Sequence, residues 1–301
     1  MDTTWDCIVV GGGGAGLSAA LVLGRARRRT LLLDTGGQSN RAAHAIGGLL
    51  GQDGRRAADF YAHGRGELAA YPAVQVRDIE AVAAARDDAA FVVDLAGGAR
   101  ERATTVLLAT GMDYRAADIP GIAEHWGRSV FHCPFCHGWE HRERPLAVLG
   151  DGPAGIHRGL LLSAWSDDVT VLDGSLDAEA RERLQAAGVR VDAREVAQVR
   201  GDGDTLEAVV FADGAEIPCE GLLVAVTLEQ RSPLAAQLGI ETAPPSPLSA
   251  EALAVRQMGM TNVPGVFAAG DVTGQMPSVA NVIASGSNAA AAIVGYLTGA
   301  M

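Results

Sequence analysis

Apolar and polar residues alternate along this chain in a pattern that predicts strands and helices in turn. Residues 5–10 form an almost continuous apolar run, a glycine-rich turn follows, and apolar residues then recur at helical spacing before a second apolar run ends at Asp34. Short apolar runs are typical of strands buried in a parallel sheet, and a period near 3.6 is typical of an amphipathic helix. The pattern predicts strand, turn, helix and strand within residues 6–34.

The same order of elements returns at residues 145–173, so the chain is built twice. Each copy is followed by three short alternating stretches separated by glycine turns, which predict a small meander and a closing strand. These stretches are residues 73–85, 89–95 and 100–111 after the first copy, and residues 188–199, 205–212 and 215–226 after the second.

The end of the chain predicts how the two copies are connected. Residues 265–297 contain a short apolar strand, the pair Gly270-Asp271 and an Ala-rich helix, and we expect this strand to return to the first domain. The fold class is therefore α/β, with two Rossmann-like (three-layer ββα) dinucleotide-binding domains, the second inserted in the first. We assign residues 1–113 and 228–301 to the first domain and residues 114–227 to the second.

Composition and charge exclude several classes of protein. The 301 residues are 48% hydrophobic and 20% charged, as in ordinary globular proteins, and the net charge of −12 disfavours nucleic acids and anionic membranes as partners. The basic residues are all arginine, so a Schiff-base lysine is excluded. No signal peptide is evident, and apolar runs such as residues 221–228 are shorter than the roughly 20 residues of a membrane span. We expect a cytoplasmic protein that binds no membrane.

Glycines in both copies have the spacing of nucleotide-binding loops. Gly11, Gly13 and Gly16 occupy the G-x-G-x-x-G positions, where they permit a tight turn, approach of a pyrophosphate and close packing of helix on strand. Asp34 ends the next strand, where a carboxylate can bind ribose hydroxyls. In the second copy the corresponding residues are Gly150, Gly152, Gly155 and Asp173.

Cys133 and Cys136 form a C-x-x-C motif, with His132, His137 and His141 around it. Three interpretations are open: a zinc site, a structural disulfide and a redox dithiol. A zinc site needs four ligands, and a reducing compartment disfavours a structural disulfide, so the position beside a nucleotide-binding unit favours the redox dithiol. Pro134 suits the first turn of a helix whose N-terminus would favour a thiolate. We interpret Cys7 and Cys219 as core residues and expect no metal.

Together, these motifs resemble those of the low-molecular-weight thioredoxin-reductase-like flavoproteins. The resemblance includes "GGQSN", "LLATGMDYR" and "GVFAAGD", and a C-x-x-C just before the second glycine motif. It implies a homodimer whose first domain binds FAD, with Cys136 passing electrons to the flavin and Cys133 attacked by the substrate. The FAD-binding residues that it implies are Gly11, Gly13, Gly14, Ala15, Gly16, Asp34, Thr35, Gly37, Gln38, Asn40, Arg41, Ala109, Thr110, Gly111, Gly270, Asp271, Ser278, Val279 and Ala280.

Two departures from the reductase pattern bear on the direction of electron flow. Asp173, Gly174 and Ser175 stand where NADPH-dependent reductases have a His-Arg-Arg cluster, so the second domain is expected to use NADH or to bind no nicotinamide. His137 follows the dithiol where those reductases have an acidic residue. The resulting pattern C-x-x-C-H-G-aromatic-E resembles the dithiol oxidases of the gliotoxin and holomycin pathways.

This second resemblance implies an oxidase that closes a disulfide in a small-molecule dithiol, with O2 as acceptor and H2O2 as product. His137 is then the first candidate for the base and His132 the second, although either residue could merely solvate a loop. Two other functions stay open. One is an NADH- or NADPH-dependent reductase of a protein such as thioredoxin, and the other is a flavin-binding redox sensor without turnover.

Overall fold

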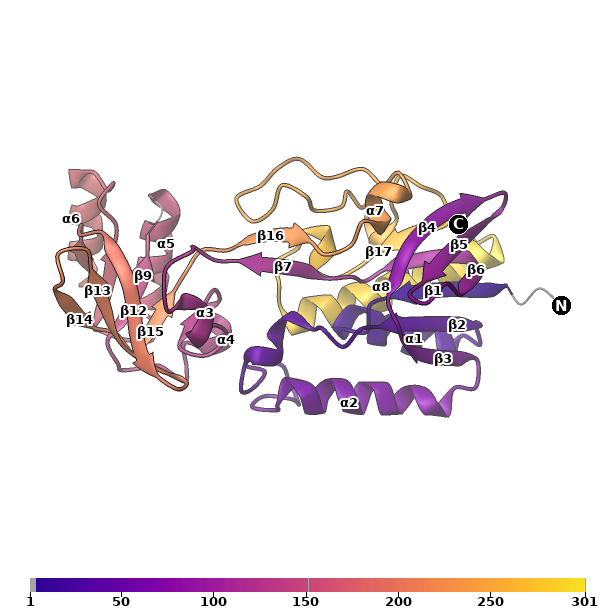
Figure 1. The fold of residues 1–301 in the computed structure, drawn as a ribbon, viewed down its shortest axis with the longest axis horizontal. Helices are drawn as coiled ribbons and strands as arrows, with labels where there is room; N and C mark the ends of the chain where they lie inside the picture. The colour runs from indigo at the N-terminus through magenta and orange to yellow at the C-terminus, as the bar shows by residue number, and fades with distance from the viewer. Residues whose placement is uncertain (1–3, 151, 301) are drawn as a thin grey trace. The chain divides into compact units, whose positions relative to one another are not determined.

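The computed structural model describes residues 4–150 and 152–300, which form two compact units (Figure 1). The first unit contains the described residues up to Ser39, together with Ala58–Tyr114 and the residues from Thr227 onward. The second contains Asn40–Ala57 and Arg115–Val226. The chain therefore passes between the units four times.

The first unit is built on a seven-stranded sheet that is mainly parallel. Strands β3, β2, β1 and β6 lie side by side; β6 pairs antiparallel with β5 through its first half and parallel with β17 through its last half. The strands are β1 (Trp5–Val10), β2 (Thr30–Asp34), β3 (Val74–Asp78), β4 (Ala81–Asp87), β5 (Ala90–Leu95), β6 (Arg100–Leu108) and β17 (Val266–Ala268). Pairing of β17 with β6 confirms that the last strand returns to the first domain.

Two helices pack on each other beside this sheet, and their close approach depends on small residues. Helix α1 (Gly14–Arg25) contacts α8 (Val279–Thr298), where the Ser18 hydroxyl donates to the Ile283 carbonyl over 2.8 Å. A Cβ atom on Gly286 would lie 2.0 Å from the carbonyl oxygen of Ala15, so glycine is required there. By length and composition α8 could cross a membrane, and one face of it packs on α1 in the core of the first unit.

The second unit repeats the parallel arrangement with five strands, in the order β11-β10-β9-β15-β8. A separate antiparallel sheet is formed by β12, β13 and β14. The strands are β8 (Val130–Phe131), β9 (Leu146–Leu149), β10 (Val169–Leu172), β11 (Arg190–Asp192), β12 (Val196–Asp202), β13 (Thr205–Phe211), β14 (Glu216–Pro218) and β15 (Gly221–Leu223). The helices are α3 (Ile122–His125), α4 (Pro134–His137), α5 (Pro153–Leu162) and α6 (Ala178–Ala186).

The remaining elements are short or lie where the chain passes between the units. Strand β7 (Met112–Arg115) pairs with β16 (Thr227–Gln230) in a two-stranded ladder. The other elements are α2 (Ala57–Glu67), α7 (Leu234–Gln237) and the 3₁₀ helices η1 (Ser39–Ala42), η2 (Leu68–Ala70), η3 (Gln257–Gly259) and η4 (Asp271–Thr273).

The structure differs from the sequence prediction in two respects. Residues 40–57, which we assigned to the first domain, belong to the second unit, because Gly47 packs against Cys136 and His44 Nε2 lies 3.0 Å from the Asp204 carboxylate. In addition, the stretch 73–85 is two strands: β3 extends the parallel sheet beside β2, and only β4 enters the meander. The stretch 215–226 likewise divides into β14 and β15.

Candidate functional site

In the glycine-rich loop of the first unit, close packing requires two of the glycines, whereas the third has free space beside it. A Cβ atom on Gly11, whose φ is +106°, would lie 2.2 Å from the Ala109 carbonyl oxygen, and one on Gly16 would lie 1.8 Å from the Gly11 carbonyl oxygen. These two glycines let β1 turn closely into α1. On Gly13, by contrast, a Cβ atom would meet nothing nearer than the Gln38 side chain at 3.9 Å. No protein contact explains this third glycine, whereas the approach of a pyrophosphate would.

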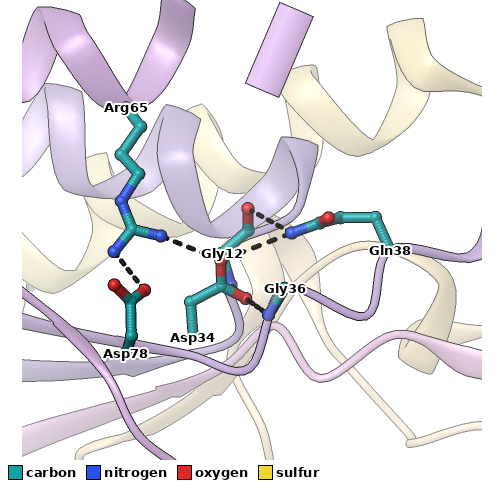
Figure 2. Close-up of polar contacts among 6 residues, drawn as sticks. All are labelled: Gly12, Asp34, Gly36, Gln38, Arg65 and Asp78. Carbon is teal, nitrogen blue, oxygen red and sulfur yellow. Dashed lines mark hydrogen bonds and ion pairs between the residues drawn. The ribbon is translucent and has the colours of Figure 1, made fainter. Parts of the chain in front are cut away.

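Asp34 fixes the loop from the end of β2, as Figure 2 shows. One carboxylate oxygen accepts hydrogen bonds from the backbone N–H groups of Gly12, over 3.2 Å, and Gly36, over 3.0 Å. The other accepts from the Gln38 amide over 3.3 Å and faces the Arg65 guanidinium at 3.5 Å. Arg65 also pairs with Asp78. A carboxylate therefore lies beside the glycine loop, where an adenosine ribose would present its hydroxyl groups.

A cavity in the first unit brings most of the predicted cofactor-binding residues together. Those that line it are Gly11, Gly13, Gly14, Ala15, Asp34, Thr35, Gly37, Gln38, Ala109, Thr110, Gly111, Gly270 and Asp271. Gly16 is not among them because it packs β1 on α1. Asn40, Arg41, Ser278, Val279 and Ala280 do not line this cavity either: Asn40 and Arg41 lie in the second unit, and Ser278 caps the first turn of α8.

Several further residues at this cavity were not predicted from the sequence. Tyr61, Arg231 and Ser232 line it, and Tyr114 donates a hydrogen bond to the Asp271 carboxylate over 2.9 Å. Burial raises the pKa of Asp271, and the Tyr114 hydroxyl and Arg231 partly oppose that rise. Arg231 Nε lies 2.7 Å from Asp113. Residues so distant in sequence carry no shared local pattern, although Tyr114 stands in the "LLATGMDYR" stretch.

The glycine loop, the N-terminus of α1, Asp34 and Asp271 suit FAD. Its pyrophosphate needs close backbone approach and a helix N-terminus, which the open space at Gly13 and the start of α1 supply. Helix α1 has no acidic residue in its first turn to repel an anion.

The dithiol lies at the start of α4 in the second unit. Cys133 is the N-cap residue and Pro134 occupies the first helical turn, as the sequence predicts. The two Sγ atoms are 2.6 Å apart, so formation of a covalent S–S bond of about 2.05 Å needs only a small movement. Cys7 and Cys219 are fully buried, and burial raises the pKa of each thiol to about 12, which agrees with their interpretation as core residues.

The two sulfur atoms of the dithiol differ in acidity. A hydrogen bond from the Cys136 thiol lowers the pKa of Cys133 to about 7; burial opposes this shift, and the backbone amides of Cys136 and Phe135 reinforce it. The same hydrogen bond raises the pKa of Cys136, with burial and the charges of Cys133 and Glu140 acting in the same direction. In the reduced pair Cys133 is therefore the thiolate and Cys136 holds the proton.

His137 is held in one tautomer beside the dithiol. Its Nε2 atom lies 3.1 Å from the Gly127 carbonyl oxygen, which can only accept, so the proton is on Nε2. Nδ1 is buried and has no hydrogen-bond partner within residues 4–150 and 152–300. The ring stacks on Phe131 at 5.5 Å. Burial lowers the pKa of His137, partly opposed by the backbone carbonyls of Gly127 and Cys133 and by Glu140, which favours the neutral ring at pH 7.

The other two histidines are less suited to proton transfer. His132 stacks on Trp126, and burial, reinforced by the charge of His137, lowers its pKa to about 4, which makes it a weak base at neutral pH. His141 donates its Nε2–H to the Arg128 carbonyl over 3.2 Å. Within the part of the chain that the structure describes, no three His, Cys, Asp or Glu side chains gather as metal ligands.

In the second glycine motif, both oxygen atoms of the Asp173 carboxylate accept hydrogen bonds from nearby residues of the same unit. One Asp173 oxygen accepts from the Gly152 N–H over 2.8 Å, and the other accepts from the N–H and hydroxyl groups of Ser175 over 2.8 and 2.6 Å. Partial burial acts to raise the pKa of Asp173, but these hydrogen bonds outweigh it and the pKa is lowered. An ionised carboxylate at this position repels a 2′-phosphate.

Comparisons with known proteins cover nearly the whole chain. The model of the family described as pyridine nucleotide-disulphide oxidoreductase matches residues 5–289. Thioredoxin reductase tcpT of Claviceps purpurea is 32% identical over 294 residues, which are 93% of this chain and 90% of that protein. Among solved structures, an oxidoreductase from Agrobacterium tumefaciens is 35% identical with a TM-score of 0.91 over 97% of both chains. HlmI is 34% identical with a TM-score of 0.89, over 98% of this chain and 93% of that one.

Proposed function

This chain belongs to the pyridine nucleotide-disulphide oxidoreductase family, and we propose that within it the protein is an FAD-dependent dithiol oxidase. The comparisons show that the chain is an FAD-binding thiol–disulfide oxidoreductase. In the proposed reaction, the protein closes a disulfide in a small-molecule dithiol, and dioxygen accepts the electrons. The observation that carries it is His137 beside the dithiol, whose Nε2 faces the Gly127 carbonyl and whose buried Nδ1 has no hydrogen-bond partner among the described residues.

The first half of the proposed reaction is attack on the oxidised pair. A substrate thiol gives its proton to Nδ1 of His137, and the resulting thiolate attacks Cys133. The bond between Cys133 and Cys136 breaks, a mixed disulfide forms on Cys133, and Cys136 leaves as a thiol after His137 returns the proton. Because Nε2 is held by the Gly127 carbonyl, the ring stays oriented throughout this transfer.

The second half releases the product. The remaining substrate thiol attacks the substrate sulfur of the mixed disulfide, which closes the product disulfide and expels Cys133. A sulfur with a lowered pKa is the better leaving group, and the pKa of Cys133 is about 7 once Cys136 can donate a hydrogen bond to it. The substrate has then lost two electrons and two protons: Cys136 holds the first proton, His137 takes the proton of the second thiol, and Cys133 leaves as a thiolate.

FAD, when bound, would accept two electrons from the reduced pair and pass them on to dioxygen. The balanced reaction is one dithiol plus one O2 giving one cyclic disulfide plus one H2O2. Asp173 disfavours NADPH as the electron donor, because a carboxylate stands where a 2′-phosphate would bind, and leaves NADH or no nicotinamide. The resemblance of the dithiol motif to the gliotoxin and holomycin oxidases supports a small-molecule substrate. The expected homodimer and cytoplasmic location belong to the same proposal.

One observation also favours the reverse direction. A thiolate at Cys133 near neutral pH suits attack on the disulfide of a protein such as thioredoxin, and relatives of this chain carry the name thioredoxin reductase. In that case NADH or NADPH would have to reduce the flavin.

Anaerobic reduction of the flavin separates these two functions. Dithiothreitol, NADH and NADPH are added separately to the purified holoprotein, and bleaching of the flavin absorbance is followed before air is admitted. The oxidase is supported if dithiothreitol bleaches the flavin, both nicotinamides fail, and air restores the colour with one H2O2 per dithiol. Rapid bleaching by either nicotinamide contradicts it. Cys133→Ser and Cys136→Ser are controls that should abolish bleaching by the dithiol.

A further inference from the structure

The exposed large apolar side chains of the second unit lie on the turn that carries the dithiol and on the loop that packs against this turn. Seven large hydrophobic side chains are exposed among the described residues, and three of them lie in the second unit: Leu50 at 99%, Phe135 at 67% and Trp139 at 65%. Phe135 stands between the two cysteines, and Trp139 is three residues beyond Cys136. Leu50 lies on the loop 46–55, which packs against this turn. Exposed apolar groups confined to one place mark a binding surface.

Phe135 and Trp139 lie on the same side of one helical turn. The Gly138 N–H donates to the Pro134 carbonyl over 2.7 Å, so the helical turn of α4 continues and places residues four apart on one face. The Phe135 ring meets Trp165 edge to face at 5.4 Å, and the guanidinium of Arg142 lies 4.0 Å from the centre of the Trp139 ring. Both rings are thus held in place by a neighbour while most of their surface stays in solvent.

The loop that carries Leu50 is seated on the backbone of the same turn. Pairing of Ile46 with Arg55 closes the loop, and the Gly48 N–H donates to Asp53 over 2.8 Å. A Cβ atom on Gly47 would lie 2.6 Å from the Cys136 carbonyl oxygen, and one on Gly48 would lie 3.9 Å from the Phe135 carbonyl oxygen. The dithiol, the two aromatic rings and the Leu50 loop therefore form one local structure.

We propose that Leu50, Phe135 and Trp139 form an apolar patch that binds the scaffold of a neutral, apolar dithiol and so sets the substrate specificity of the oxidase. This inference rests on the proposed function and names its substrate class. A substrate bound at this patch must bring a thiol to Cys133 and cover the rings of Phe135 and Trp139. This requirement favours a dithiol whose carbon scaffold can stack on aromatic rings. The negative charge of Glu140 is close enough to Cys136 to disfavour a thiolate there. The same charge disfavours an anionic thiol such as glutathione, as does the net charge of −12.

The test compares two dithiols of different polarity and the anionic monothiol glutathione on the holoprotein. Anaerobic flavin reduction is measured with 1,2-benzenedimethanethiol, dithiothreitol and glutathione, for the wild type and for Trp139→Ala, Leu50→Ser and Trp139→Phe. Wild type should prefer the aromatic dithiol. In Trp139→Ala and Leu50→Ser, the second-order rate constant for flavin reduction by that dithiol should fall about tenfold, with a smaller fall for dithiothreitol, and Trp139→Phe should retain most of the wild-type rate. Val82→Ala removes an exposed apolar side chain of the first unit and should change neither rate.

Several results would overturn the inference, and they separate it from the proposed function. If dithiols bleach the wild-type flavin and the patch variants behave as the wild type, the patch inference alone fails. Equal losses for both dithiols, or a wild-type preference for glutathione, also overturn it. If the variants slow only a reaction with reduced thioredoxin, or change only the sedimentation of the protein, the occupant is a protein or a second copy. A wild-type flavin that no dithiol bleaches overturns both proposals.

Discussion

Gly47 lies so close to Cys136 that a Cβ atom on Gly47 would come within 2.6 Å of the Cys136 carbonyl oxygen. Contact of backbone on backbone cannot be relieved by rotating a side chain. The glycine therefore allows the loop 46–55 to hold the redox turn from outside the C-x-x-C motif. Through this contact, a residue far from the dithiol in sequence holds the backbone of Cys136.

Replacing Gly47 with alanine should displace that turn without disturbing the FAD cavity. Overpacking of this kind costs about 1–3 kcal/mol, and a small misplacement of reacting atoms slows a reaction by roughly ten- to a hundredfold. We expect Gly47→Ala to bind a full complement of FAD but to be reduced slowly by dithiothreitol. Gly66→Ala is the matched control, because a Cβ atom there meets nothing within 4 Å. Equal reduction rates for the two variants would show that the contact has no role.

Alkylation of the reduced protein should be selective for Cys133. Its pKa of about 7 means that the reactive thiolate forms as pH rises through neutrality, whereas the proton stays on Cys136, whose pKa is raised. Iodoacetamide should therefore modify Cys133 with a rate that levels off above about pH 8. Mass spectrometry identifies the modified residue, and Cys7 and Cys219 serve as internal controls since burial should leave them unmodified. A rate that still rises steeply at pH 9 would contradict the lowered pKa.

Two glycines of the first motif should respond differently to alanine. Gly16→Ala places a Cβ atom 1.8 Å from the Gly11 carbonyl oxygen, so it should destabilise the fold and lower the melting temperature of the apoprotein. Gly13→Ala meets no protein atom nearer than 3.9 Å, so the apoprotein should melt as the wild type does while FAD binding weakens at least tenfold. Melting curves of apoprotein and FAD titrations measure both effects. Loss of stability in Gly13→Ala would mean that this glycine also serves the fold.

Local sequence patterns predicted most of the architecture, because the strands and the helix of a β–α–β unit each have a recognisable spacing of apolar residues. Glycine spacing located the loop at Gly11, and the acidic residue after the second strand located Asp34, since both depend on residues close in sequence. The start of α4 was likewise readable from Pro134. These features are local, and the structure contains each of them.

Contacts between distant segments were not readable in the same way. Packing of residues 40–57 on the redox turn joins Gly47 to Cys136, and the hydrogen bond from Tyr114 to Asp271 spans an even longer stretch of chain. Neither pair produces a periodic signal. The role of Asp173 was predictable only in part: its charge was evident, but not that Gly152 and Ser175 already occupy both of its oxygen atoms.

His137 should carry the pH dependence of substrate oxidation. Only its neutral form can accept the substrate proton, and because burial lowers its pKa below the usual value near 6.5, that form should persist in mildly acidic solution. The wild-type rate of flavin reduction by dithiothreitol should therefore rise with pH through a pKa below 6.5.

In His137→Asn, the rise of the rate with pH that comes from the His137 pKa should disappear. The rate at pH 6 should fall by roughly a hundredfold, and the loss should shrink at pH 9, where the substrate thiol ionises without a base. Stopped-flow measurements from pH 5 to 9 test this, with His141→Asn as the control, because the Nε2 atom of His141 is likewise bound to a backbone carbonyl. If the two variants lose the same amount at every pH, His137 supports the turn structurally, and the base must be sought elsewhere.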